Sequence, residues 1–361
     1  MTRYVRMAAV ATVLVTVGAL LHSSVSTSYE PCPVAPPIDD LGIALGAGYT
    51  ALPKSDIEIN VDAVRDSGSS WVRFDVDWSS IEAEQGQFDW SGTDRLVEAS
   101  KSAGLEVLAL ITYTPAWARD SKAPASDSHT KPADPATFAT FAAIAAQRYG
   151  DAISAWEIWN EPNLHMFFNP APDPTYYSTL LSLSSAAIKR VQPHATIVSG
   201  GLSPAPDDGV NISPTTFLSE MYQSGVRTHF DAVGMHPYSF PAMPSDPLTK
   251  SWNAFFRMKT MRQTMIDNGD AAKTIWATEF GSPTGNDPTS VTTADQAAIL
   301  RDGINEARRG GYVSKLFVYS LVDRGIDKGD REQNFGLLDA AFEPKPAMKV
   351  LEDASKTGGC T

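Results

Sequence analysis

The segment Ala155-Trp156-Glu157-Ile158-Trp159-Asn160-Glu161-Pro162-Asn163 is an apolar run that stops at a glutamate and a proline. The segment Thr274-Ile275-Trp276-Ala277-Thr278-Glu279-Phe280-Gly281 repeats this layout later in the chain. A carboxylate at the end of a buried strand costs free energy unless it lies in a functional cleft. Both segments therefore predict a buried strand that carries a functional carboxylate, Glu161 or Glu279.

Six further apolar runs rich in Val, Ile and Leu accompany these two, and helix-like segments alternate with all of them. Near-continuous apolar runs are typical of parallel strands that are buried on both faces. Eight strand–helix units in this order predict an α/β fold, a single (β/α)8 TIM barrel. The predicted strands are residues 41–45, 70–75, 105–111, 153–159, 196–199, 231–235, 274–278 and 315–320.

The predicted helices have recognisable ends. Asp134-Pro135, Asp173-Pro174 and Ser213-Pro214 each place a capping side chain before a proline at the first helical position. Ser55-x-x-Glu58 and Thr293-x-x-Gln296 have the pattern of capping boxes. Glycines stand just past the predicted helix ends, where a left-handed residue is needed: Gly68, Gly104, Gly150, Gly225 and Gly269.

The ends of the chain differ from the barrel, which we expect to span residues 41–356. Residues 1–28 begin with Arg3 and Arg6 and continue with the apolar stretch Met7–Leu21, which is the layout of a secretory signal peptide. An uncleaved N-terminal membrane anchor is the alternative. Residues 29–40 form a proline-rich linker, and 357–361 a short tail. We therefore expect a secreted or extracytoplasmic protein, or one anchored to the outer face of the cell membrane.

The chain has two cysteines, Cys32 and Cys360. Export favours disulfides, and a closed barrel brings its first and last elements together. We predict a bridge between these two residues; two free thiols are the alternative.

Charge and composition exclude several partners. The net charge of −13 repels phosphate backbones, so nucleic acid is not expected as a partner, and the chain is a poor match for an anionic membrane surface. Motifs of phosphate, dinucleotide and zinc sites are absent from the sequence. Asp75-x-Asp77 could suggest a metal or nucleotide-sugar site, but the end of a strand explains it more simply. We expect no cofactor, no metal and a monomer.

The connections after the predicted strands are long, and a barrel of this kind builds its active site on that face. Long loops suggest the walls of a groove for a polymeric substrate. The connections are residues 112–134, 160–173, 236–250, 280–293 and 321–343.

Glu161 and Glu279 follow the fourth and seventh predicted strands, so they face each other across the barrel mouth. Two carboxylates in this arrangement are the minimum needed to hydrolyse a glycosidic bond. A retaining mechanism needs them ~5–5.5 Å apart and an inverting one ~6.5–9.5 Å.

Trp159-Asn160-Glu161-Pro162-Asn163 resembles the acid/base motif of the clan A retaining glycoside hydrolases, and the segment around Glu279 resembles their nucleophile strand. The resemblance covers roughly residues 41–351 and is strongest to family 39 and its exopolysaccharide-hydrolase relatives. Further similar stretches are Val72–Asp75 with Trp78, Ile81–Asp89, Asp94–Val97, Tyr113–Ala118, His236–Tyr238 and Phe335–Pro346.

The resemblance implies that Glu161 is the general acid/base and Glu279 the nucleophile. It further implies that Asn160 binds the sugar 2-hydroxyl and that Arg73 and Tyr238 hydrogen-bond to Glu279, with His236 beside them. Many clan members carry a histidine where this chain has Thr112 and Tyr113, and a tryptophan where Tyr319 stands; these changes affect the sugar-binding subsite.

Other side chains have two interpretations. Trp78 and Trp117 could stack on a sugar or fill the core, and we favour stacking for Trp117. His165 and Asp323 lie in loops of the active face and could contact substrate. Glu157 shares the alternation of Glu161, and we interpret it as the partner of an internal arginine.

The sequence thus indicates an exported, retaining endo-glycosidase that cleaves β-linked sugars of a polysaccharide. An exo-acting glycosidase and a transglycosylase on the same scaffold are alternatives. A non-catalytic carbohydrate-binding barrel is a third, which the intact carboxylate pair disfavours.

Overall fold

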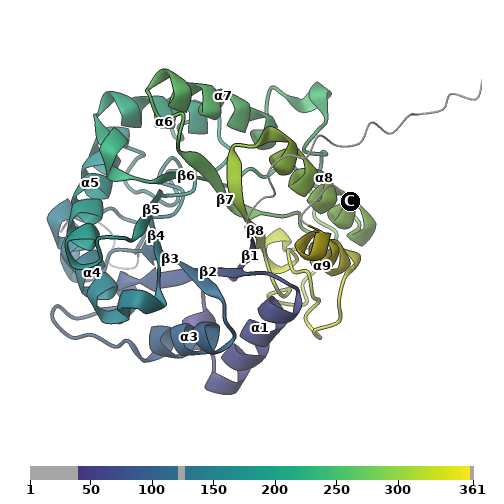
Figure 1. Ribbon diagram of the computed structural model, residues 1–361, viewed down its shortest axis with the longest axis horizontal. Helices are drawn as coiled ribbons and strands as arrows, with labels where there is room; N and C mark the ends of the chain where they lie inside the picture. The colour runs from purple at the N-terminus through teal and green to yellow at the C-terminus, as the bar shows by residue number, and fades with distance from the viewer. Residues whose placement is uncertain (1–39, 121–126, 358–361) are drawn as a thin grey trace, which may run out of the picture. The chain divides into compact units, whose positions relative to one another are not determined.

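The computed structural model describes residues 40–120 and 127–357, and these form a closed barrel of eight parallel strands. Neighbouring strands pair in chain order, and β1 closes the ring against β8. Helices surround the strands (Figure 1). The strands are β1 (Asp40–Ala44), β2 (Trp71–Asp77), β3 (Glu106–Thr112), β4 (Ala155–Ile158), β5 (Thr196–Ser199), β6 (Ala232–Met235), β7 (Thr274–Phe280) and β8 (Val313–Tyr319). The predicted (β/α)8 barrel is confirmed.

The helices alternate with the strands. They are α1 (Lys54–Asp66), α2 (Trp78–Ile81), α3 (Ser91–Ser102), α4 (Pro135–Tyr149), α5 (Pro174–Val191), α6 (Pro214–Gln223), α7 (Ala254–Asp267), α8 (Thr293–Gly310) and α9 (Pro346–Thr357). Within the described part of the chain, none of them is long and apolar enough to cross a membrane. The predicted signal peptide or anchor and both cysteines, Cys32 and Cys360, lie outside the described residues.

The proline-based helix starts are confirmed, whereas both predicted capping boxes are wrong. Helices α4, α5 and α6 begin at prolines that follow capping side chains. Helix α1 begins after Pro53, so Ser55 lies inside its first turn and bonds to Asp56 instead. Helix α8 begins one residue earlier than expected, because Thr292 supplies the capping oxygen, to the N–H of Asp295.

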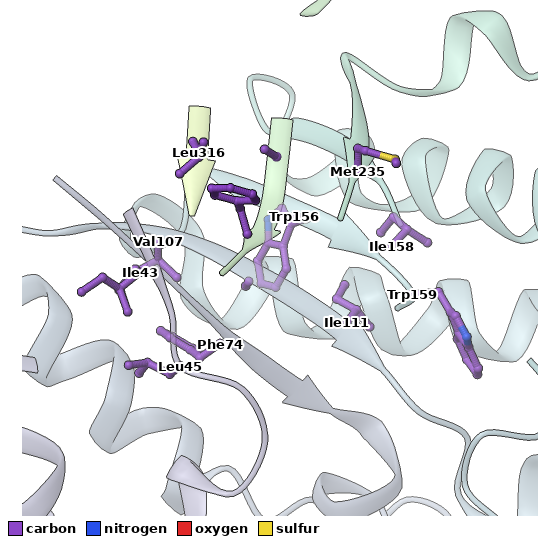
Figure 2. Packing of buried hydrophobic residues seen from close by; sticks show 14 of the residues in the cluster. Ile43, Leu45, Phe74, Val107, Ile111, Trp156, Ile158, Trp159, Met235 and Leu316 are labelled. Atoms are coloured by element: carbon purple, nitrogen blue, oxygen red, sulfur yellow. The ribbon is translucent and has the colours of Figure 1, made fainter. Parts of the chain in front are cut away.

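The buried apolar residues form two clusters. The larger one lies between strands and helices, and Figure 2 shows some of its members, among them Ile43, Phe74 and Val107. The smaller cluster takes one residue from each strand, including Trp71, Trp276 and Phe317. The rings of Trp71 and Trp276 meet edge to face with centroids 5.5 Å apart. This cluster closes one end of the interior, so a site can open only above it.

Candidate active site

The inward-facing residues of β2 form three levels. Alternate residues of a strand point to the same side, so Trp71, Arg73 and Asp75 face the interior at increasing height. Trp71 belongs to the small apolar cluster, Arg73 is buried in an ion-pair network, and Asp75 lines the main cavity. Within five residues of β2, the inward-facing side chains therefore change from an apolar core residue to a buried arginine and then to a carboxyl group at the cavity.

Arg73 joins three acceptors from two other strand ends. Its Nε donates to Glu157 at 2.6 Å, Nη1 donates to Glu279 at 2.7 Å, and Nη2 donates to the side-chain oxygen of Asn160 at 3.2 Å. Glu157 also accepts hydrogen bonds from the N–H of Gly201 and the hydroxyl of Thr278, both at 2.9 Å. Glu157 is thus the partner of an internal arginine, as we expected.

Glu279 points inward because β7 is irregular near its end. The pairing of β7 with β8 shifts register between Ala277 and Phe280, and such a shift re-aims side chains at barrel rims. Thr278 bonds to Glu157 inside the barrel, yet the adjacent Glu279 also reaches the interior and bonds to Arg73. The hydroxyl of Tyr238 donates to the second oxygen of Glu279 at 2.7 Å.

The surroundings of Glu279 favour its ionised form. Burial alone would raise the pKa of this carboxyl, but His236, Arg73 and the hydrogen bond from Tyr238 hold it below the ordinary value. An ionised carboxylate with both oxygens hydrogen-bonded is suited to act as a nucleophile.

Glu161 lies beyond β4 on a backbone in unusual conformations. Trp159 has φ 69° and Glu161 has φ 44°, which is the left-handed region that non-glycine residues rarely adopt. The strain brings Glu161 over the barrel mouth. One oxygen of Glu161, one of Glu279 and a ring nitrogen of His236 all lie within 4.8 Å of one another.

His236 lies between the two carboxylates. Its Nδ1 is 2.8 Å from Oε1 of Glu161 and 3.6 Å from Oε2 of Glu279. Burial opposes protonation of the ring, but the two carboxylates raise the pKa of His236 above its ordinary value. Its Nε2 has no hydrogen-bond partner among the described residues. A Cβ on Gly201 would lie 2.1 Å from this nitrogen, so the close approach requires glycine there.

Glu161, His236 and Glu279 are also close enough to hold a metal ion. Arg73 and Tyr238 already occupy both oxygens of Glu279 with hydrogen bonds, and the guanidinium would repel a cation. The trio therefore fits proton sharing better than metal binding.

A cavity of about 820 Å³ opens above this network. The predicted residues Glu161, Glu279, Asn160 and Tyr238 line it, and so do Tyr113 and Tyr319. Its volume is in the ordinary range for binding sites. The structure therefore brings these predicted side chains together at one cavity.

Neither of the two predicted tryptophans lines the main cavity. Trp78 is fully buried, with its indole nitrogen 2.6 Å from the carboxylate of Glu82 and its ring against Phe138 and Phe141. Trp117 packs edge-on against Trp78 and donates to the carbonyl of Glu82. Trp117 is half-buried and does not line the main cavity, so the structure gives no support to the prediction that it stacks on substrate.

The two loop residues also lie elsewhere. Asp323 is buried, and it accepts hydrogen bonds from Lys345 at 2.7 Å and from the N–H of Gly336 at 2.9 Å. It therefore fixes the loop after β8 and does not line the main cavity. His165 is exposed and lines a second cavity of about 540 Å³.

Sequence reasoning missed several cavity-lining residues. Asp75 was assigned to the end of a strand. His129, from the loop after β3, packs against Tyr113 with ring centroids 4.4 Å apart. Trp252, from the loop after β6, is 47% exposed. Their position in long loops after strands was the only available signal. Further lining residues are Met166, Phe240, Arg324, Arg331, Glu332 and Phe335.

Comparisons with known proteins agree with this geometry. Residues 139–359 match the family model described as "Glycosyl hydrolases family 39". A β-xylosidase from Geobacillus stearothermophilus is 25% identical in an alignment of 226 residues that covers 57% of this chain and 42% of that protein. The chain thus spans less than half the length of this curated relative.

Two solved structures show the same fold. One is a family 39 glycoside hydrolase from Bacteroides cellulosilyticus WH2, with a TM-score of 0.70, 23% identity, and coverage of 90% of this chain and 64% of that one. The other is a monomeric β-xylosidase from Caulobacter crescentus CB15, with a TM-score of 0.65, 18% identity, and coverage of 88% and 69%.

Proposed function

The chain belongs to glycosyl hydrolases family 39, and we propose that it hydrolyses a β-glycosidic bond of a polysaccharide by retaining double displacement. The observation that carries the proposal is the pair of carboxylates, with oxygens of Glu161 and Glu279 within 4.8 Å of each other. A separation of this size is closer to the ~5–5.5 Å between the carboxyl groups of retaining enzymes, in which one carboxylate attacks the sugar directly, than to the ~6.5–9.5 Å of inverting ones.

In the first step, an oxygen of Glu279 attacks the anomeric carbon as the bond to the leaving oxygen breaks. Glu161 gives its proton to that oxygen, so the leaving chain departs as a neutral alcohol. Arg73 and Tyr238 hold Glu279 in place for attack. Asn160, which Arg73 orients, is placed to meet the sugar 2-hydroxyl.

In the second step, a water molecule attacks the anomeric carbon of the glycosyl ester. Glu161, now a carboxylate, takes the proton of that water, and Glu279 leaves as a carboxylate again. Esterification removes the negative charge of Glu279, which makes the change of role of Glu161 from acid to base electrostatically favourable. His236 bridges both groups and shares a hydrogen bond with Glu161.

We favour cleavage within a chain over cleavage at its end. The cavity extends from the carboxylates to the exposed side chains of Trp252 and Met166, which are 47% and 62% exposed. Exposed apolar side chains at a cavity mouth support binding of further sugar units. Cleavage at the chain end is the alternative, and the curated relative is named a β-xylosidase.

Export is a separate proposal, which rests on the sequence of residues 1–28. N-terminal sequencing of the protein recovered from its native envelope or medium tests signal cleavage. Mass analysis with and without reductant tests the Cys32–Cys360 bridge.

Azide rescue tests the assignment of the two carboxylates. Glu161→Ala should lose about 10²- to 10⁴-fold in kcat on glycosides with poor leaving groups, but much less on 2,4-dinitrophenyl β-glycosides, which need no acid. Azide should then yield the β-glycosyl azide with Glu161→Ala and the α-glycosyl azide with Glu279→Ala. Near wild-type turnover by both variants would show that other residues carry the reaction.

A further inference from the structure

The carboxylates of Asp75 and Asp77 lie on the same side of β2 but have different surroundings. Asp77 accepts hydrogen bonds from the backbone of Ser79 and Tyr113 and from the hydroxyls of Ser79 and Ser80. It caps α2 and is fully used by the protein. Within residues 40–120 and 127–357, no side chain or backbone group hydrogen-bonds to the carboxylate of Asp75, although this residue lines the main cavity.

An ionised carboxyl group at the position of Asp75 lowers the stability of the folded protein. Burial raises the pKa of its carboxyl to about 7; Arg73 opposes this shift, and Asp77, Glu279 and Glu157 add to it. Because the folded protein favours the protonated form, this carboxyl lowers stability progressively as the pH rises from about 4 to about 7, and the full loss persists at higher pH. Arg73 offsets part of this cost, but no hydrogen bond to the carboxylate from the described residues does so, whereas Asp77 has such hydrogen bonds.

The position of Asp75 connects it to the reacting groups. Arg73, two residues earlier on the same side of β2, bonds to Glu279, so Asp75 lies one level above the nucleophile's partner. Tyr113 lines the same cavity. Burial raises the pKa of its hydroxyl, and Asp75 raises it further, more than Glu161 or Glu279 does. A sugar ring placed for attack by Glu279 would meet both Asp75 and Tyr113.

We propose that Asp75 is a specificity-determining residue, which accepts hydrogen bonds from hydroxyl groups of the sugar whose anomeric carbon Glu279 attacks. This inference rests on the proposed function of the site. A carboxylate has two oxygens with free lone pairs and can bind two neighbouring hydroxyls at once. A neutral sugar fits better than a cationic amino sugar, because the positive charge of Arg73 already acts on Asp75.

The test compares Asp75→Asn with wild type on paired substrates. The first substrate is the 4-nitrophenyl β-glycoside that wild type hydrolyses best, chosen among xyloside, glucoside, mannoside and galactoside. The others are its monodeoxy analogues and the analogue with an amino group in place of the hydroxyl most affected. Asp77→Asn is the matched control, because it removes a neighbouring carboxylate that the protein itself uses.

For at least one hydroxyl we expect its removal to lower wild-type kcat/KM by about 10- to 100-fold, the range for hydrogen bonds to charged groups. Asp75→Asn should lower kcat/KM for the parent glycoside by a similar factor. For that deoxy analogue, its kcat/KM should be little lower than that of wild type. Its melting temperature at pH 8 should equal or exceed that of wild type. Asp77→Asn should be less stable, and any loss of kcat/KM should be equal for all substrates.

An equal loss for every substrate in Asp75→Asn would overturn the inference, since the residue would then act only through the charge of the site. A preference of wild type, lost in Asp75→Asn, for the amino analogue over the parent would overturn the neutral-sugar assignment. A wild type that hydrolyses no glycoside contradicts the proposed function itself. Turnover that depends on Glu161 and Glu279, with a uniform effect of Asp75→Asn, contradicts this inference alone.

Discussion

The floor and the mouth of the cavity are built in different ways. The floor consists of Arg73 from β2, Glu157 from β4, Glu279 from β7 and Tyr238 just after β6. Hydrogen bonds of 2.6–2.7 Å join their side chains. The mouth consists of loop residues such as Met166 and Trp252, which are largely exposed. The floor can position reacting atoms, whereas the mouth can adapt to different chains.

This difference between floor and mouth separates the residues that should control catalysis from those that should control binding of long substrates. A buried ion-pair network is rigid, and removal of one member leaves an uncompensated charge. An exposed side chain contributes only through the area it buries on the ligand. Substitutions in the floor should therefore change stability, pH dependence and kcat, and substitutions in the mouth should change KM for long substrates.

The largest effect is expected for Glu157→Gln. This change leaves Arg73 without one of its two carboxylates and should lower the free energy of unfolding by about 3–5 kcal/mol. It should also lower kcat, because Arg73 no longer has a fixed position against Glu279. Urea denaturation and steady-state kinetics measure both effects.

Lys189→Gln is the control for that experiment. Lys189 pairs with Asp231 at the surface, with side chains 36% and 42% exposed, so the loss should be less than about 1 kcal/mol. Equal destabilisation by the two variants would contradict the distinction between floor and surface.

Tyr238→Phe should shift the acid limb of the kcat/KM profile to higher pH. The Tyr238 hydroxyl stabilises ionised Glu279, whose pKa lies below its ordinary value, so without it the pKa rises and the nucleophile is protonated at a higher pH. One hydrogen bond to a charged group corresponds to a displacement of about one pH unit or slightly more.

Tyr149→Phe removes a hydroxyl that donates to Asp94, away from the cavity. Its pH profile should match that of wild type. An acid limb that moves to lower pH in Tyr238→Phe, or that does not move, would contradict the assigned role of the hydroxyl.

The smallest effect is expected for Trp252→Ala. Loss of the exposed half of the indole as a contact surface should cost about 1 kcal/mol, roughly a fivefold rise in KM for long oligosaccharides. KM for aryl monosaccharide glycosides should not change. Leu248→Ala is the control, since Leu248 lies in the same loop, is 90% exposed and does not line the main cavity. An equal effect on short and long substrates would favour exo action.

Much of the floor could be predicted from sequence. Apolar runs located the strands, and the carboxyl ends of parallel strands in a barrel meet at one face, so Glu161 and Glu279 were expected together. Arg73, Asn160 and Tyr238 were expected beside them only because the chain resembles the clan A glycoside hydrolases. The left-handed turn at Glu161 and the register shift before Glu279 were not predictable, because they depend on the packing of neighbouring strands.

The mouth was largely unpredictable. Alternation shows which way a strand residue points, but it does not show which groups hydrogen-bond to its side chain. The sequence therefore did not distinguish the roles of Asp75 and Asp77. Loop residues have no periodicity, and for this reason stacking was favoured for Trp117 and substrate contact was considered for Asp323, while Trp252 and His129 were missed. Trp117 and Asp323 are held by hydrogen bonds to distant residues, Glu82 and Lys345, that the local sequence does not reveal.

The central claim is that Glu279 attacks the sugar directly. Proton NMR of the hydrolysis of an aryl β-glycoside, recorded before mutarotation, reports the anomer that forms first. The spacing of Glu161 and Glu279 predicts the β-anomer. An α-anomer as first product would mean that water attacks in a single step, and would contradict the account.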